Sequence, residues 1–145
     1  MIYFKYKGEP VGKGRPRITR RGNYVHTYTP AKTREFEEAI KFEFLASNCE
    51  KTPVYPKDVP IRVDMTFAFE VPRSYPKKKR AACLSGQMQM TKKPDADNIA
   101  KSVLDAICGH AFEDDSQVTM LYLEKIYAEE PYVEVRIHPR DWGSE

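Results

Sequence analysis

The sequence predicts an α/β (α+β) fold in which a small mixed β-sheet packs against two main helices. Residues 61–70 alternate apolar and polar side chains, as expected for a strand with one buried face. Residues 30–47 and 95–108 carry apolar side chains at helical spacing. No linker, repeat or shift in composition divides the chain, so residues 1–145 are expected to form a single domain.

The first half of the chain predicts a strand, a long loop and a helix. Residues 1–7 alternate apolar and basic side chains and predict a short strand. Residues 8–29 contain four glycines and two prolines and predict a loop. A loop of about 20 residues in a compact domain is usually either functional or disordered. Thr29 is the expected N-cap and Pro30 the first-turn residue of a helix that continues to about Ser47.

The second half predicts further strands around a second helix. A basic tract allows a short helix after Pro76. The amphipathic helix 95–108 is expected to end at Gly109, because glycine readily adopts the conformation that terminates helices. Residues 116–128 and 132–137 predict two strands, which we expect to run antiparallel.

The charges of the chain are unevenly distributed. The net charge is only +3, but residues 1–34 carry +8, residues 71–93 carry +7 and the remainder carries −12. Such tracts are often no more than solvated faces, but here they contain Gly, Pro, Tyr and Ser in place of helical salt-bridge partners. The pattern therefore predicts a polyanionic partner held near a cluster of carboxylates.

The composition favours a cytoplasmic protein with no membrane partner. Charges interrupt every apolar stretch well before the roughly 18 residues of a membrane span. Residues 1–7 contain lysines where a signal peptide needs apolar residues. The three cysteines form no C-x-x-C pair and are too few for a disulfide framework, which is typical of a reducing compartment.

The helix 95–108 carries the most informative residues. Asp95 follows a proline and is a candidate N-cap, which places Asp97 in the first turn. Asp97, Lys101 and Asp105 are four residues apart and therefore share one helix face. The opposite, apolar face comprises Ile99, Val103, Leu104 and Ile107. The helix is thus expected to pack on the sheet while it exposes carboxylates and a lysine.

These carboxylates predict a site for a hard divalent cation. Mg²⁺ is usually held by a few carboxylates together with water and substrate phosphate, and Asp95, Asp97 and either Asp114 or Asp115 supply such a set. The pair at 114–115 precedes the next strand, from which a side chain is expected to reach back to the start of the helix. Each element also has a simpler interpretation: a helix cap, an ion pair between Asp97 and Lys101, and an acidic turn.

Other chemistries find little support. The segment beginning at Asp95 has alanine at position 100, where a calcium loop requires glycine, and Gly12-x-Gly14 lacks the third glycine of a dinucleotide motif. The histidines have no zinc spacing with any cysteine, and no Ser or Cys has a neighbouring base. His26, in the basic loop, is retained as a candidate DNA contact.

Taken together, the motifs resemble those of the RusA family of Holliday junction resolvases (crossover junction endodeoxyribonucleases), common in phages and prophages. The segments P-D-A-D-N-I-A-K-x-x-L-D-A (94–106) and D-D-S-Q-V (114–118) carry the resemblance. G-K-G-R-P-R (12–17), Y-T-P (28–30) and K-K-K-R (77–80) are similar to the versions found in Gram-positive hosts and their phages. The resemblance extends over essentially the whole chain.

The resemblance implies a RusA-like, homodimeric, Mg²⁺-dependent endonuclease that nicks opposed strands of a four-way junction, with Mn²⁺ as an alternative ion. The catalytic residues of the family then fall on Asp95, Asp97, Lys101 and Asp115, and the three aspartates are the implied metal ligands. The connecting loop is one residue shorter than in the family pattern, so Asp114 is a less favoured alternative. Gln117 after the pair favours Asp115.

We therefore predict a structure-selective endodeoxyribonuclease that resolves Holliday junctions by paired nicks in DNA recombination and repair. The alternatives are a nuclease of the same family that acts on other branched DNA or replication forks, and a nucleic-acid-binding protein without catalysis. The expected DNA-binding residues are Lys13, Arg15, Arg17, Arg20, Arg21, Lys77, Lys78, Lys79, Arg80, Lys92 and Lys93. The strands at 61–70 and 132–137 carry more apolar side chains than two helices need to cover. This surplus adds support for a homodimer, and the alternative is that it lies in the core of the monomer.

Overall fold

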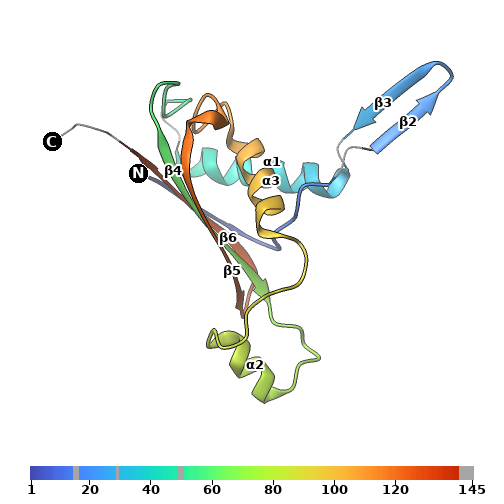
Figure 1. Cartoon of the computed structure of the whole chain (residues 1–145), viewed down its shortest axis with the longest axis vertical. Coiled ribbons are helices and arrows are strands. Elements are labelled where there is room, and N and C mark those ends of the chain that lie inside the picture. Colours follow the sequence, from blue (N-terminus) through green and yellow to red (C-terminus); the bar gives the residue numbers. More distant parts are fainter. Residues whose placement is uncertain (15–16, 29, 49–50, 141–145) are drawn as a thin grey trace.

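The computed structural model describes residues 1–14, 17–28, 30–48 and 51–140 (Figure 1). It confirms the mixed α/β fold, with a four-stranded sheet, a separate two-stranded sheet and three α-helices among these residues. The elements in chain order are β1 (Ile2–Lys7), β2 (Arg17–Arg21), β3 (Tyr24–Tyr28), α1 (Ala31–Ser47), β4 (Ile61–Glu70), α2 (Lys77–Leu84), α3 (Ala96–Ile107), the short 3-10 helix η1 (Asp115–Gln117), β5 (Val118–Ala128) and β6 (Tyr132–Pro139).

The four-stranded sheet has the order β1-β6-β4-β5. β4 pairs in parallel with β5 and antiparallel with β6, and β6 pairs antiparallel with β1. The strands predicted at 116–128 and 132–137 do run in opposite directions, but they are not neighbours because β4 lies between them. The parallel pairing of β4 and β5 requires a crossover connection, which contains α2 and α3.

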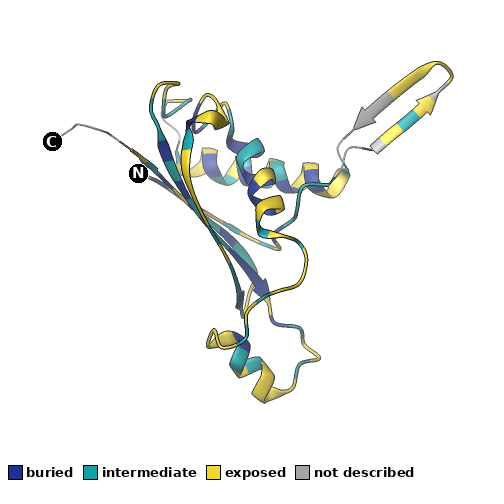
Figure 2. Cartoon of the chain, in the orientation of Figure 1, coloured by how far each residue is buried: buried dark blue, intermediate teal, exposed yellow. Residues whose placement is uncertain are grey.

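The core lies between this sheet and the two longer helices. Ile61, Val63 and Met65 are buried on the face of β4 toward the helices, whereas the alternate residues Arg62 and Asp64 are only half-buried. Figures 1 and 2 show α1 and α3 packed on the same side of the sheet, with the buried residues concentrated between the layers. The helix residues buried there include Phe36, Ile40, Phe44, Ile99, Val103 and Ile107. The alternation in β4 and the apolar stripe of α3 are thus confirmed.

The helix limits agree closely with the prediction, with one correction at the start of α1. Its N-cap is Pro30, so the proline precedes the helix and does not occupy its first turn. The predicted cap Thr29 lies outside the described residues. α2 confirms the short helix after Pro76, and Gly109 follows α3 with a φ of +88°, a value that favours glycine. None of the described helices is long and apolar enough to cross a membrane.

The prediction of a loop throughout residues 8–29 is wrong. β2 and β3 form an antiparallel hairpin with Arg21 paired to Tyr24, and Figure 1 shows it projecting away from the rest of the molecule. Gly22, with a φ of +60°, fits the first central position of a type II′ turn, which suits a two-residue hairpin loop. The many Gly and Pro residues favoured the prediction of a loop. The two short strands also lack the alternation of apolar and polar side chains that packing against a core would require.

Candidate active site

The first turn of α3 exposes two carboxylates. Asp95 is the N-cap residue, and its main-chain carbonyl accepts hydrogen bonds from the N–H groups of Asn98 and Ile99, both at 3.1 Å. Its carboxylate makes no capping hydrogen bond. Asp97, in the first turn, is also exposed, and neither carboxylate has a side-chain hydrogen bond or ion pair with any other described residue. Both groups are therefore available to bind a ligand.

Lys101 lies one turn further along α3 and pairs with Asp105. Its Nζ is 3.2 Å from Oδ1 of Asp105, and its side chain is 57% exposed. The alternative interpretation of the sequence, an ion pair between Lys101 and Asp97, does not occur. The other carboxylate oxygen of Asp105 lies 3.0 Å from Nζ of Lys13, which also contacts Glu37 at 2.6 Å.

Lys13, expected to bind DNA, is thus engaged within the protein. Burial lowers the pKa of its ammonium, but hydrogen bonds with Glu37 and Asp105 outweigh this effect and raise the pKa overall. The adjacent main chain is anchored as well, because the N–H of Lys13 donates to the carbonyl of Asn98 and the Asn98 side chain donates back to the carbonyl of Lys13, both at 3.1 Å. The segment is held against α1 and α3.

The pair Asp114 and Asp115 lies at the start of β5, where Gln117 fixes the loop. The Asp114 carboxylate accepts hydrogen bonds from the hydroxyl of Ser116 and the main-chain N–H of Gln117, and the bond from Ser116 lowers its pKa. The carboxylate of Asp115 has no side-chain hydrogen bond or ion pair within the described ranges. Of the two, Asp115 is therefore the one left available.

Gln117 itself is buried and makes four short hydrogen bonds to main-chain groups, besides a longer one of 3.4 Å to the carbonyl of Tyr55. Its amide nitrogen donates to the carbonyls of Pro56 at 2.8 Å and Val59 at 2.9 Å. Its amide oxygen accepts from the N–H groups of Glu113 and Asp114, both at 2.9 Å. The side chain thereby ties the Asp115 loop to the segment before β4. The sequence identified this glutamine only through the family pattern and did not predict its structural role.

The candidate metal ligands lie at opposite ends of α3. At the C-terminal end of the helix, the thiol of Cys108 donates to the main-chain carbonyl of Glu113 at 3.7 Å, which places the loop that carries Asp115 beside that end. Asp97 is eleven residues before Cys108, which corresponds to about 16 Å along the helix. Figure 1 shows the loop to β5 beside the end of α3 and away from its first turn. The expected approach of Asp115 to the start of the helix therefore does not occur within one chain.

Consistent with this separation, the described ranges contain no group of three or more Asp, Glu, His or Cys side chains that could hold a metal ion. The donors themselves suit Mg²⁺, since they are carboxylate oxygens without competing partners at Asp95, Asp97 and Asp115. The chemistry of the set fits the ion, whereas its arrangement in one chain does not bring all three ligands together.

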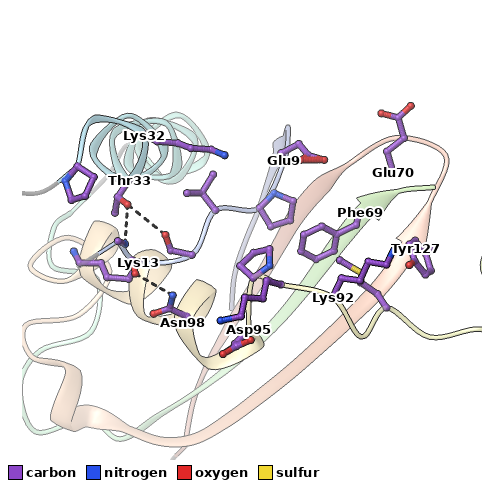
Figure 3. A pocket seen from close by; sticks show the side chains of 18 of the residues that line it. Glu9, Lys13, Lys32, Thr33, Phe69, Glu70, Lys92, Asp95, Asn98 and Tyr127 are labelled. Atoms are coloured by element: carbon purple, nitrogen blue, oxygen red, sulfur yellow. Dashed lines mark hydrogen bonds between the residues drawn. The ribbon is translucent and has the colours of Figure 1, made fainter. Parts of the chain in front are cut away.

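A cleft of about 990 Å³ adjoins the start of α3 (Figure 3). Asp95 lines it together with basic side chains from both halves of the chain, which are Lys13, Lys32, Lys92 and Lys93. Figure 3 places Asp95 between Lys32 and Lys13 on one side and Phe69 and Tyr127 on the other. The cleft therefore brings a candidate ligand and several cations to one surface.

The second basic tract is carried by α2 and the segment after it. Lys77, Lys78 and Lys79 are exposed and Arg80 is half-buried, while Lys92 and Lys93 are exposed near the cleft. Tyr75 organises part of this group: its hydroxyl accepts a hydrogen bond from Lys92 at 2.9 Å, and the ammonium of Lys79 lies 4.0 Å from its ring centre. The hydrogen bond from Lys92 lowers the pKa of Tyr75. The tyrosine was not singled out from the sequence.

The first basic tract extends into the β2–β3 hairpin. Arg20 is exposed there. Arg17 and Arg21 lie at the two ends of β2, so their main chain belongs to the projecting hairpin. Arg15 lies outside the described residues, and nothing in the structure tests His26 as a DNA contact. Figure 1 shows the hairpin and α2 extending from different parts of the molecule, with the first turn of α3 between them.

Comparison with known proteins identifies the family. The model of the family described as "Endodeoxyribonuclease RusA" matches residues 7–138. The chain belongs to the RusA family. A protein of Bacillus subtilis (strain 168), "Uncharacterized protein YqaN", is 38% identical over 136 residues, which cover 94% of each chain. The resemblance deduced from the aspartate and lysine spacing is thereby confirmed, and the family is one of endodeoxyribonucleases.

Proposed function

We propose that this protein is a Mg²⁺-dependent, structure-selective endodeoxyribonuclease that resolves four-way DNA junctions in recombination and repair. The match to the RusA family over residues 7–138 carries this proposal. The geometry of α3 supports it, because Asp95 and Asp97 are exposed and unpaired beside Lys101. Two basic extensions, the β2–β3 hairpin and α2, lie on either side of that helix turn and provide surface for a polyanion.

The residues of α3 suit phosphodiester hydrolysis. Asp95, Asp97 and Asp115 would hold Mg²⁺ or Mn²⁺, which when bound makes water nucleophilic at neutral pH and stabilises charge on the phosphate. Lys101 would place its ammonium against an oxygen of the scissile phosphate or the leaving group, where a compact positive charge is most useful in the transition state. Its 57% exposed side chain leaves the ammonium accessible to DNA.

The basic extensions would position the substrate through its phosphates. Arg17, Arg20 and Arg21 belong to the projecting hairpin, and Lys77 to Arg80 belong to α2. Contacts of this kind fix the register of a nucleic acid without reading its sequence. Binding from both sides of the first turn of α3 would bring a phosphate to the carboxylates there.

A homodimer is the proposed working unit. A four-way junction contains two equivalent strands to cut, and one symmetric particle can nick both before it dissociates. The structure adds a second reason, since Asp115 lies at the far end of α3 from Asp95 and Asp97. A second copy offers a source for the third carboxylate that one chain does not bring to the site.

The test is cleavage of a synthetic four-way junction, a linear duplex and a flap, each with and without Mg²⁺. We expect Asp97→Asn and Lys101→Ala to abolish cleavage while junction binding stays largely intact, because both act in the chemistry and not through the basic extensions. Glu38→Gln and Lys41→Ala are matched controls on α1, because among the described residues the two pair only with each other, and they belong to none of the candidate site residues.

The outcomes separate the alternatives. Junction binding without cleavage, with or without Mg²⁺, would favour a non-catalytic binding protein. Cleavage of the flap in preference to the junction would favour a nuclease for other branched DNA. Normal cleavage by Lys101→Ala would leave this lysine as a surface partner of Asp105, and loss of binding in a folded Asp97→Asn variant would contradict the role of Asp97 as a metal ligand.

A further inference from the structure

Four charged side chains of alternating sign connect the exposed face of α3 to α1. Lys101 contacts one oxygen of Asp105 at 3.2 Å, and Lys13 contacts the other at 3.0 Å. Lys13 in turn contacts Glu37 at 2.6 Å. The side chain of Lys101 is 57% exposed, whereas those of Asp105, Lys13 and Glu37 are 28%, 24% and 21% exposed. The row thus has one accessible end and three members that are largely shielded.

The shielded end of this row has little freedom to move. The main chain of Lys13 exchanges two hydrogen bonds with Asn98 on α3. The next residue, Gly14, donates its N–H at 2.9 Å to the hydroxyl of Thr33, a buried residue of α1. A Cβ at Gly12 would lie 2.9 Å from the Asn98 side chain, and one at Gly14 would lie 2.8 Å from Pro30, so the segment packs too closely to admit larger residues.

We propose that Asp105 is a positioning residue for Lys101, and that Lys13 and Glu37 act through Asp105. Lys13 would then serve the catalytic helix from within the basic amino-terminal tract and would not bind a DNA phosphate. The inference rests on the proposed function, since it assigns a purpose to the orientation of Lys101.

The physical basis is the sharing of one carboxylate between two ammonium groups. A lone ion pair between exposed side chains four residues apart on a helix is weak and fixes neither side chain well. Here Asp105 is itself held by Lys13, whose main chain is anchored to α3 through Asn98 while that of the next residue, Gly14, is anchored to α1. Removing the charge of Lys13 would release Asp105, and Lys101 would then sample more orientations. A displacement of about 1 Å at a catalytic group can cost on the order of 100-fold in rate.

The experiment compares Lys13→Gln, Asp105→Asn and the double variant with the wild-type protein. Single-turnover junction cleavage at saturating protein, junction affinity as a function of salt, and the melting temperature are measured for each. Lys41→Gln is the matched control, because Lys41 also forms an ion pair on α1 but lies outside the row and the DNA-binding residues.

We expect Lys13→Gln and Asp105→Asn each to cut about 10- to 100-fold more slowly. The double variant should be no slower than the slower single variant, because both changes act through Lys101. Asp105→Glu, which keeps the charge, should recover part of the rate. The junction affinity and its dependence on salt should match those of the wild-type protein, and Lys41→Gln should behave as wild type throughout.

Three results would overturn the inference. If the slope of log affinity against log salt concentration were shallower by about 0.9 in Lys13→Gln, the value of one phosphate contact, Lys13 would be shown to bind DNA. A lower melting temperature with an unchanged cleavage rate in the folded protein would show a purely structural role. Multiplied losses in the double variant would show that the two residues act independently. Failure of the wild-type protein to cut any branched substrate would instead overturn the proposed function. It would also overturn the role of Asp105 in positioning Lys101 for cleavage.

Discussion

Replacing Gln117 by methionine should destabilise the protein strongly, although methionine is similar in volume. Gln117 is 5% exposed and makes hydrogen bonds of 2.8–2.9 Å with four main-chain groups of the two segments it joins. Methionine can make none of them, so the carbonyls of Pro56 and Val59 and the N–H groups of Glu113 and Asp114 would lose a partner.

The magnitude follows from the number of bonds. Each hydrogen bond contributes about 0.5–1.5 kcal/mol net, and water reaches part of this exposed loop, so the free energy of unfolding should fall by roughly 2–4 kcal/mol. A native domain is stable by only about 5–15 kcal/mol, which makes this a large fraction of the total. The melting temperature should fall by about 6–12 °C for a chain of this size.

Urea denaturation followed by circular dichroism measures the change. Gln89→Met is the matched control, because Gln89 is exposed and makes no side-chain hydrogen bond with the rest of the described chain. Its effect should stay within about 0.5 kcal/mol. If Gln117→Met lost less than about 1 kcal/mol, the bonds to the two segments would contribute almost nothing net, and the account of how the Asp115 loop is held would be refuted.

Three further predictions concern DNA binding, pH and assembly. Replacing Arg15 and Arg17 together by Gln should flatten the salt dependence of junction binding by about 1.8, or 0.9 for each phosphate contact, and an unchanged slope would reject both contacts. Burial would raise the pKa of Glu134, but hydrogen bonds from Tyr3 and Arg136 lower it overall, so Glu134→Gln should be less stable than wild type at pH 7. Urea titrations should show this gap closing as the pH falls below the carboxyl's ordinary pKa of 4.5, and a gap independent of pH would contradict it. Light scattering should give twice the monomer mass of 16.8 kDa, and a mass of 16.8 kDa at every concentration that supports cleavage would exclude the dimer.

Much of the fold was predictable because its signals are local. The alternation over 61–70 and the apolar stripe of 95–108 repeat within a few residues, and each repeat matches the geometry of one element. The separation of charge into two basic tracts and an acidic remainder can likewise be read directly from the order of the residues. The spacing of the aspartates and Lys101 was specific enough to indicate the family, which the match over residues 7–138 confirms.

The hairpin at 17–28 was missed because its signals conflict locally. Glycine and proline are dense around it, and its strands are only five residues long and project from the body without a core to alternate against. The sheet order was equally hidden, because it depends on contacts between distant parts of the chain. β5 and β6 follow each other in the sequence, yet they pair with opposite edges of β4 and not with each other.

At the site, the sequence predicts which residues share a helix face, but only the tertiary structure determines which of their charges pair. Helical spacing offers Lys101 two partners, Asp97 and Asp105, at equal distance along the chain. Asp105 is the partner in the structure, where Lys13, 92 residues away in the sequence, holds the second oxygen of that carboxylate. Asp115 lies at the far end of α3 because the helix is rigid and the chain leaves it there to begin β5. Spacing along the chain determines which residues share a helix face, whereas the contacts between helices and loops determine which of their charges meet.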